Sequence, residues 1–166
     1  MKKNIKITML LIALISAAVL GVVLTLFIVN NNNEFEKNLT VSENGTLSDT
    51  LEMKGLGLFP GSSRDFVVNV KGSDKGTYAF TLTFRDKNSG LLSEYISVDI
   101  TMGNKKFSYR LSELFDGKIV EGSALLKSNE KSKLIIRYTM DEHAGNETQN
   151  ATADFDILLQ VRQLQD

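Results

Sequence analysis

The chain has 166 residues, a formal net charge of −1 and no cysteine, which leaves room for about one domain. The lack of cysteine excludes a disulfide framework, a cysteine metal site and the lipid attachment of a bacterial lipoprotein. Because the sequence shows no basic stripe, we expect no nucleic-acid partner.

Residues 1–29 are predicted to form an N-terminal transmembrane helix. The run 7–29 carries no charge, and as a helix it would be roughly 34 Å long, close to the roughly 30 Å hydrocarbon core of a bilayer. A cleavable signal peptide usually has a shorter apolar region of about 7–15 residues. We therefore expect an uncleaved anchor, with a cleaved signal and a secreted protein as the alternative. The expected membrane contacts include Ile7, Leu14, Leu20 and Val29.

Three lysines before this run, Lys2, Lys3 and Lys6, set the expected topology. By the positive-inside rule they keep the N-terminus in the cytoplasm and place everything after residue 29 outside the cell. Without them, 16 basic and 20 acidic residues remain, which is typical of an ordinary soluble surface. Residues 30–45 begin with four asparagines and are predicted to be a polar linker, because they hold too few apolar side chains to build a core.

Residues 46–166 are predicted to be an extracellular, all-β domain. Apolar and polar residues alternate in short runs bounded by turn residues, which favours an antiparallel β-sandwich. Pro60-Gly61 fits the two central positions of a type II turn, and segments 91–95 and 110–118 can each hold a short helical turn. The expected strands are 47–53, 66–71, 78–85, 96–102, 107–111, 134–140 and 153–161.

The last of these runs alternates most strictly and follows the amide-rich segment 144–152. Phe155, Ile157 and Leu159 fall on one side of it, so a shift of one residue in register would turn all three outward. We expect this strand to lie inside a sheet, with its register fixed by the preceding turn.

No residue is predicted to be catalytic, to bind a cofactor or to bind a metal. The chain has one histidine, and the consecutive Asp141, Glu142 and His143 are typical of a solvated turn. Asp154 and Asp156 share one strand face about 7 Å apart, a spacing that also suits paired acid chemistry. Alternating polar residues on a solvent-facing strand account for them more simply.

Three stretches together resemble the TasA/camelysin family of exported β-sandwich proteins: LGLFPGSSRDF (56–66), AGNETQNATADF (144–155) and VRQ (161–163). That family shows a PG turn before its second strand, and a GN-x-x-Q turn before a last strand that ends near a glutamine. The matching positions here are Pro60, Gly61, Gly145, Asn146, Gln149 and Gln163. The resemblance implies that Asn146 and Gln149 are structural residues, which fix the loop by amide hydrogen bonds to backbone.

The resemblance also implies a jelly-roll-like β-sandwich on the outside of the cell, and a function. Relatives of TasA polymerise into matrix fibres by passing an N-terminal strand to the next subunit, and camelysin carries a metallopeptidase label. Family members usually have a shorter apolar segment and a cleavage site, whereas the run here continues to Val29. The expected function is that of a non-enzymatic surface or matrix protein without cofactor. Its segment 34–53 adds to a neighbour's sheet, or its segment 46–53 folds back as the chain's own first strand.

Two other functions remain open. The first is a monomeric, membrane-anchored binding domain, for which an exposed aromatic patch including Tyr95 and Tyr109 would be the signal. The second is a camelysin-like metallopeptidase, which is harder to reconcile with a single histidine because catalytic zinc normally has three protein ligands.

Overall fold

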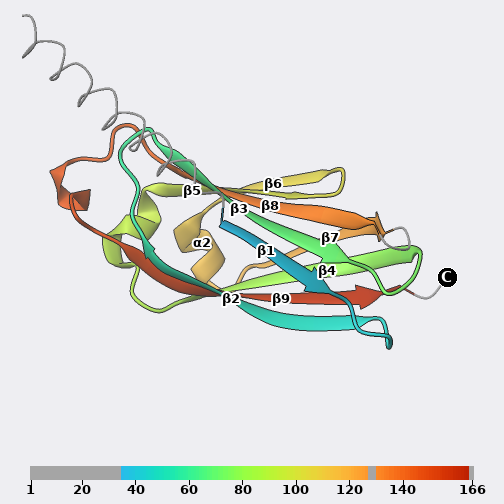
Figure 1. Cartoon of the computed structure of the whole chain (residues 1–166). Coiled ribbons are helices and arrows are strands. Elements are labelled where there is room, and N and C mark those ends of the chain that lie inside the picture. The colour runs from blue at the N-terminus through green and yellow to red at the C-terminus, as the bar shows by residue number, and fades with distance from the viewer. Residues whose placement is uncertain (1–34, 127–129, 165–166) are drawn as a thin grey trace, which may run out of the picture. The chain divides into compact units, whose positions relative to one another are not determined.

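The computed structural model describes residues 35–126 and 130–164 (Figure 1). The chain divides into two units, residues 1–33 and 34–166, and all the described residues belong to the second. The expected membrane contacts Ile7, Leu14, Leu20 and Val29 and the lysines Lys2, Lys3 and Lys6 lie outside the described residues. Across the described ranges, no helix combines the length and the apolarity that a membrane span requires.

The described residues form an all-β unit of two sheets, here named sheet A and sheet B. Sheet A has the strand order β1(Phe35–Thr40), β3(Ser63–Lys71), β8(Lys131–Met140), β5(Ile96–Met102) and β6(Lys105–Arg110). Sheet B has the order β2(Thr46–Leu56), β9(Ala153–Gln163), β4(Gly76–Asp86) and β7(Ile119–Leu126). Three short helices connect strands: η1(Gly90–Glu94), α2(Leu111–Phe115) and η2(Asn146–Thr148).

The inner faces of the two sheets share one core, to which every strand of sheet B contributes. Alternation explains this core, because successive side chains of a strand point to opposite faces. Strand β9 is the clearest case: five alternate residues are at most 2% exposed, and β9 lies between β2 and β4 as the alternation predicts. The largest fully buried side chains are Tyr78, Tyr138, Phe66, Phe155, Leu51, Leu56, Leu82, Leu92, Ile96, Ile100, Met102 and Leu111.

The linker expected at 30–45 is wrong for residues 35–40. These residues form strand β1, which pairs with β3 at the edge of sheet A. The composition argument failed here because an edge strand needs backbone hydrogen bonds and one covered side, not a core of its own. The ring of Phe35 stacks on that of Phe66 with centroids 4.9 Å apart, and Val41, just after the strand, is 2% exposed.

Strand β7 has no counterpart among the expected strands. Its inward positions include Gly122 and Ala124, whereas Ile119 and Leu125 point outward and are more than half exposed. Val120 and Leu126 also point inward and are buried, so the strand faces the core, but its alternation of apolar and polar residues is irregular. A Cβ on Gly122 would lie 2.9 Å from Met102 Sδ, so the close approach of β5 explains why a glycine stands at an inward position.

The two segments that were expected to allow helical turns do form them, as η1 and α2. In α2, Leu111 and Leu114 are buried, and the Glu113 carboxylate accepts a hydrogen bond from Arg110 N. The strand expected at 107–111 therefore ends one residue early, at Arg110.

A row of charged residues crosses the outer face of sheet A. The guanidinium of Arg137 on β8 donates to both carboxylate oxygens of Asp65 on β3, at 2.6 and 2.7 Å. On the other side, Asp99 on β5 accepts a hydrogen bond of 2.6 Å from the Ser108 hydroxyl. The hydrogen bond from Arg137 holds the pKa of Asp65 below its ordinary value.

The Asp65–Arg137 pair gives a pH-dependent prediction. A lowered folded-state pKa contributes stability above the ordinary carboxyl pKa, and this stability disappears as the pH falls through the folded pKa. Asp65→Asn should therefore destabilise the domain by about 0.5–1 kcal/mol at neutral pH and have no effect in strong acid. Thermal unfolding across acidic pH would measure this. A constant difference between the two proteins at all pH values would contradict it, and Arg137→Gln in a double-mutant cycle is the control.

Candidate functional site

The two turn motifs singled out in the sequence meet at one end of the sheets. Residues Phe59–Ser62 form a turn in which Ser62 N donates to Phe59 O at 2.8 Å, and Gly61 has φ +75°. These are the features of the expected type II turn, in which only glycine is relaxed at the third position. The turn is held against the end of β8, because Gly61 N donates to Met140 O at 3.1 Å.

The loop after β8 carries the second motif. Gln149 Nε2 donates to Asn146 Oδ1 at 2.9 Å, so these amides bond to each other and not to backbone as the sequence suggested. The backbone contacts come from their neighbours: the Glu147 carboxylate accepts from Gly145 N at 3.1 Å, and the buried Thr148 donates to Gly145 O at 2.8 Å. Both exposed amides can bond equally well to water in other conformations, which leaves the hydroxyl and carboxylate to fix the loop.

Between the two motifs lies a hollow of about 720 Å³, which we name the loop groove. Its walls are mostly apolar, and Phe59 on its wall is 65% exposed. The residues that line it are Gly57, Leu58, Phe59, Pro60, Ala144, Gly145, Asn146, Thr148, Gln149, Asn150, Ala151 and Thr152. Four of the five expected turn residues thus form one surface, and Gly61 lies next to it.

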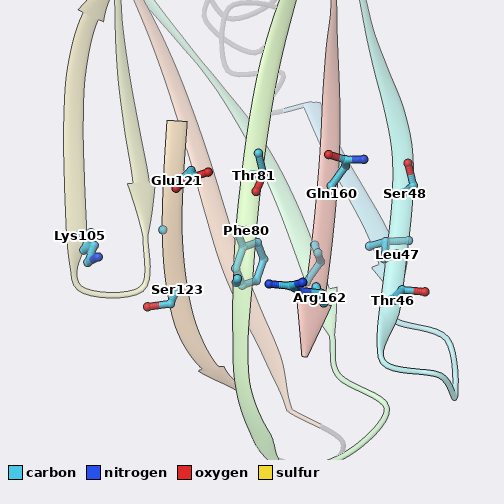
Figure 2. Close-up of a pocket in the computed structure, with 13 residues that line it drawn as sticks. Thr46, Leu47, Ser48, Phe80, Thr81, Lys105, Glu121, Ser123, Gln160 and Arg162 are labelled. Atoms are coloured by element: carbon cyan, nitrogen blue, oxygen red, sulfur yellow. The ribbon is translucent and has the colours of Figure 1, made fainter. Parts of the chain in front are cut away.

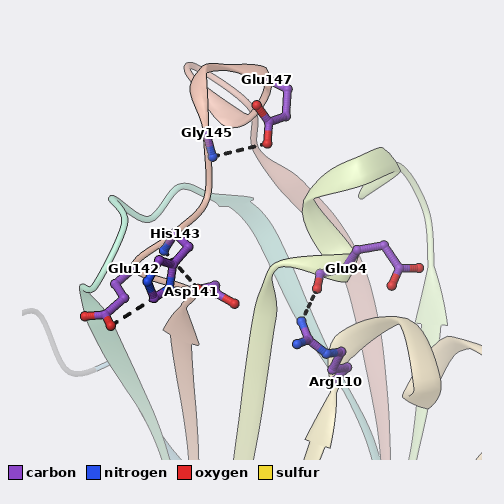
Figure 3. Close-up of polar contacts among 7 residues, drawn as sticks. All are labelled: Glu94, Arg110, Asp141, Glu142, His143, Gly145 and Glu147. Carbon is purple, nitrogen blue, oxygen red and sulfur yellow. Dashed lines mark hydrogen bonds and ion pairs between the residues drawn. The ribbon is translucent and has the colours of Figure 1, made fainter.

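Acidic side chains lie near the loop groove, and Figure 3 labels Asp141, Glu142 and Glu147 among them. A Cβ on Gly61 would lie 3.7 Å from Glu142 Cβ, which places Glu142 beside the PG turn. His143 is 85% exposed, and its Nδ1 lies 3.3 Å from Asp141 Oδ1 and 3.9 Å from Glu142 Oε1. Donation from His143 N lowers the pKa of Asp141. The segment is the solvated turn that the sequence predicted.

Glu147 is held by backbone and by one neighbouring side chain. Its own backbone N–H, the hydroxyl of Tyr95 and the backbone N–H of Gly145 all lower the pKa of its carboxyl group. Glu147 is therefore a persistent negative charge at the groove. Across residues 35–126 and 130–164, no three histidine, aspartate or glutamate side chains are grouped to hold a metal ion.

A second hollow, of about 710 Å³, lies on sheet B near the opposite end (Figure 2). Side chains from all four strands form two rows across the sheet: Thr46, Arg162, Ala79 and Ser123, then Ser48, Gln160, Thr81 and Glu121. Lys105 closes one side. The small side chains of the two rows leave the floor of the hollow low. Arg162 and Lys105 form no ion pair within the described part of the chain.

The sequence did not point to this second hollow. Threonine and serine on the outer side of a strand are what any solvated sheet contains, and the rows are assembled from four strands far apart in the chain. A weak signal was present in Ala79, a small residue in the outward series of β4.

Other candidate residues have structural roles. Asp154 accepts a 2.6 Å hydrogen bond from Gly55 N, and Asp156 pairs with Lys87 at 2.7 Å. The two carboxylates on one strand face are thus each tied to a different partner. Tyr95 and Tyr109 are partly buried against the core, and so do not form an exposed aromatic patch.

Comparison with known proteins gives no family for this chain. No family model and no curated protein matches it. The PRD1 vertex protein P5 is 12% identical, with a TM-score of 0.43 over 74% of this chain and 98% of that chain. FLHE is 11% identical, with a TM-score of 0.42 over 72% and 97%. The extracellular region of zebrafish Gpr126/Adgrg6 is 14% identical, with a TM-score of 0.42 over 80% and 15%. Likenesses this distant carry no argument about what the chain does.

Proposed function

We propose that the chain is a non-enzymatic, TasA-type protein of the cell surface or extracellular matrix, and that its copies associate by β-strand addition. The apolar run 7–29 anchors it in the membrane with the β domain outside, or is removed on secretion. A jelly-roll fold is part of this proposal. The strand order supports it, because without β1 the sheets have four strands each and most successive strands from β2 to β9 change sheet.

The observation that carries the proposal is strand β1. It is the first described segment of the chain, it lies at a sheet edge, and its pairing with β3 is parallel whereas every other pairing in the described ranges is antiparallel. An edge strand of six mostly exposed residues can leave its place at lower cost than an interior strand. A neighbour's β1 can then occupy the vacated edge of β3.

Side-chain contacts determine which strand can bind at the edge of β3. Lys37 Nζ lies 2.6 Å from Asp49 Oδ2 on β2, which joins β1 to the opposite sheet. Lys131 Nζ donates to Asn38 Oδ1 at 2.6 Å. Together with the Phe35–Phe66 stacking, these contacts fix both the register and the direction of any strand that occupies this edge. The segment 46–53 belongs to β2 and pairs with β9 of its own chain, so β1 alone is the donor.

Paired cysteines test this proposal without background, because the chain has none of its own. Lys37→Cys and Asp49→Cys, each in a separately tagged full chain, are co-expressed and treated in membranes with a short thiol-to-thiol crosslinker. Strand addition predicts covalent pairs that carry both tags. Two differently tagged Lys37→Cys chains are the control and should give few. A β1 that always stays on its own chain would leave the mixed variants unlinked.

The second candidate, an anchored monomeric binding domain, is favoured by Arg162 in the polar hollow of sheet B, which has no ion-pair partner among the described residues. A guanidinium among hydroxyl groups suits an acidic or polyhydroxylated ligand. The absence of mixed-tag pairs in the crosslinking experiment would favour this candidate over strand addition. The metallopeptidase alternative receives no support from the geometry of the described residues.

A further inference from the structure

The two ends of the sheets differ in charge. We name the end with segments 57–62, 87–95, 111–118 and 141–152 the loop end, and the end with turns 41–45, 72–75 and 103–104 the turn end (Figure 1). Counted with the two strand residues next to each segment, as at the turn end, the loop end has more acidic than basic residues. The acidic ones are Asp86, Glu94, Glu113, Asp116, Asp141, Glu142, Glu147 and Asp154, and the basic ones are Arg64, Arg85, Lys87, Arg110 and Lys118. Basic residues of the turn end are Lys71, Lys75, Lys105, Lys106, Lys131 and Arg162, against the acidic Glu43, Asp74 and Glu130.

The turn end also carries exposed apolar side chains. Leu125 on β7 pairs with Thr77 on β4, and Leu164 N donates to Thr77 O from the other side at 2.8 Å. The two leucines therefore share one row of the outer face of sheet B, and they are 61% and 37% exposed. Lys75 lies two residues before Thr77, and Arg162 lies one row inward. We name Leu125, Leu164, Lys75, Lys105 and Arg162 the turn patch.

The turn patch and the loop groove are complementary in chemistry. The groove is mostly apolar with Phe59 exposed, although amide and hydroxyl side chains also line it. Glu142 lies beside Gly61, and the carboxylate of Glu147 lies beside Gly145. The patch presents two leucines among three cations. Lys75, Lys105 and Arg162 have no ion-pair partner within the described ranges, so their charges are free to meet another molecule. Attraction between opposite charges steers such an encounter and rejects like-charged alternatives.

We propose that the loop groove of one copy binds the turn patch of a second copy. The two surfaces are different parts of the chain, so the contact is heterologous: each bound copy still offers one free groove and one free patch. Such a contact extends into a chain of copies unless its rotation closes a ring. This proposal rests on the proposed function as an assembling surface protein, but it uses a different surface from strand addition. Exchange of β1 joins copies side by side, whereas this contact joins them end to end.

Cysteine placement tests the contact directly. Full chains with Phe59→Cys and with Leu125→Cys, differently tagged and purified in detergent, are mixed and oxidised under mild conditions. The proposal predicts mixed disulfide-linked pairs roughly tenfold in excess over Phe59–Phe59 and Leu125–Leu125 position pairs, and loss of this excess at high salt. Equal yields of mixed and like pairs would overturn it.

Charge reversal supplies a second test, which asks whether the yield of mixed pairs depends on the charges of the two surfaces. Lys75→Glu with Lys105→Glu in the Leu125→Cys chain should lower the mixed yield roughly tenfold. Adding Glu142→Lys to the Phe59→Cys chain should restore it in part. All these positions are exposed, so unchanged unfolding temperatures will show that the fold is intact. A yield that ignores both reversals would also overturn the contact.

The result separates this contact from the proposed function. Linked pairs between positions 37 and 49 without pairs between 59 and 125 would leave strand addition standing and remove the end-to-end contact. The reverse pattern would keep the end-to-end contact and remove strand addition. If neither pair of positions links, both fail and the monomeric binding domain is favoured.

Discussion

Replacing Phe155 with alanine is expected to lower the free energy of unfolding by about 3–5 kcal/mol, the largest effect of any single change considered for this domain. Phe155 is 0% exposed. Its ring meets three other rings, those of Phe84, Phe115 and Tyr138, at centroid distances of 6.3, 5.6 and 5.7 Å. The substitution leaves a cavity where β9, β4, β8 and the end of α2 meet, and interior strands cannot move to fill it.

The exposed Phe59 provides the matched control. Phe59→Ala removes the same atoms from a side chain that is 65% exposed, so its effect on stability should stay within about 0.5 kcal/mol. Chemical denaturation of both variants, followed by far-ultraviolet circular dichroism, measures the difference. A small loss for Phe155→Ala would mean that the central core is loosely packed. Phe59→Ala should instead weaken the end-to-end contact, which separates stability from assembly.

The strands that sequence predicts well are those whose two faces differ strongly in polarity. Strands β4 and β9 alternate large apolar and polar residues, and both lie in the interior of sheet B, where a register error would expose the core. Strand β7 was not predicted, because Gly122 points inward and Leu125 points outward. The local sequence pattern therefore does not indicate which residues are buried. The glycine is explained by Met102, a residue twenty positions earlier, which no local window includes.

Strand β1 was not predicted for a different reason. Most of its residues are polar, as suits a strand at an edge. Its partner β3 begins more than twenty residues later. Parallel pairing leaves no local turn signal such as a hairpin supplies. Only contacts in the folded chain, such as Lys37 with Asp49, show that this segment belongs to the domain.

Part of the candidate site could likewise be predicted from the sequence, and part of it could not. The type II turn at Pro60-Gly61 could be predicted because both residue types are chosen for backbone angles that the turn requires. That this turn lies opposite residues 144–152 could not, because β3 to β8 separate the two motifs in the chain. The roles of Glu147 and Thr148 were hidden beside the more conspicuous Asn146 and Gln149, since carboxylate and hydroxyl groups accept or donate to backbone as readily as amides.

Tyr138→Phe is expected to stabilise the domain by about 1–2 kcal/mol, in contrast to most core substitutions. Tyr138 is fully buried on β8, and its hydroxyl has no hydrogen-bond partner within the described part of the chain. Burial raises the pKa of this phenol above its usual range. An unpaired buried hydroxyl loses its bonds to water on folding, so its removal ends that penalty while the ring keeps its edge contact with Phe155.

Tyr78 is the matched control, because it is equally buried but its hydroxyl is paired. That hydroxyl donates to Asp74 O at 3.1 Å and accepts from Asp74 N at 3.2 Å, which ties β4 to the turn before it. Tyr78→Phe should therefore destabilise by about 0.5–1.5 kcal/mol, so the two variants should shift the unfolding temperature in opposite directions by a few degrees. If Tyr138→Phe also lowers the unfolding temperature, its hydroxyl has a buried water as partner, and the core at the centre of sheet A is wet.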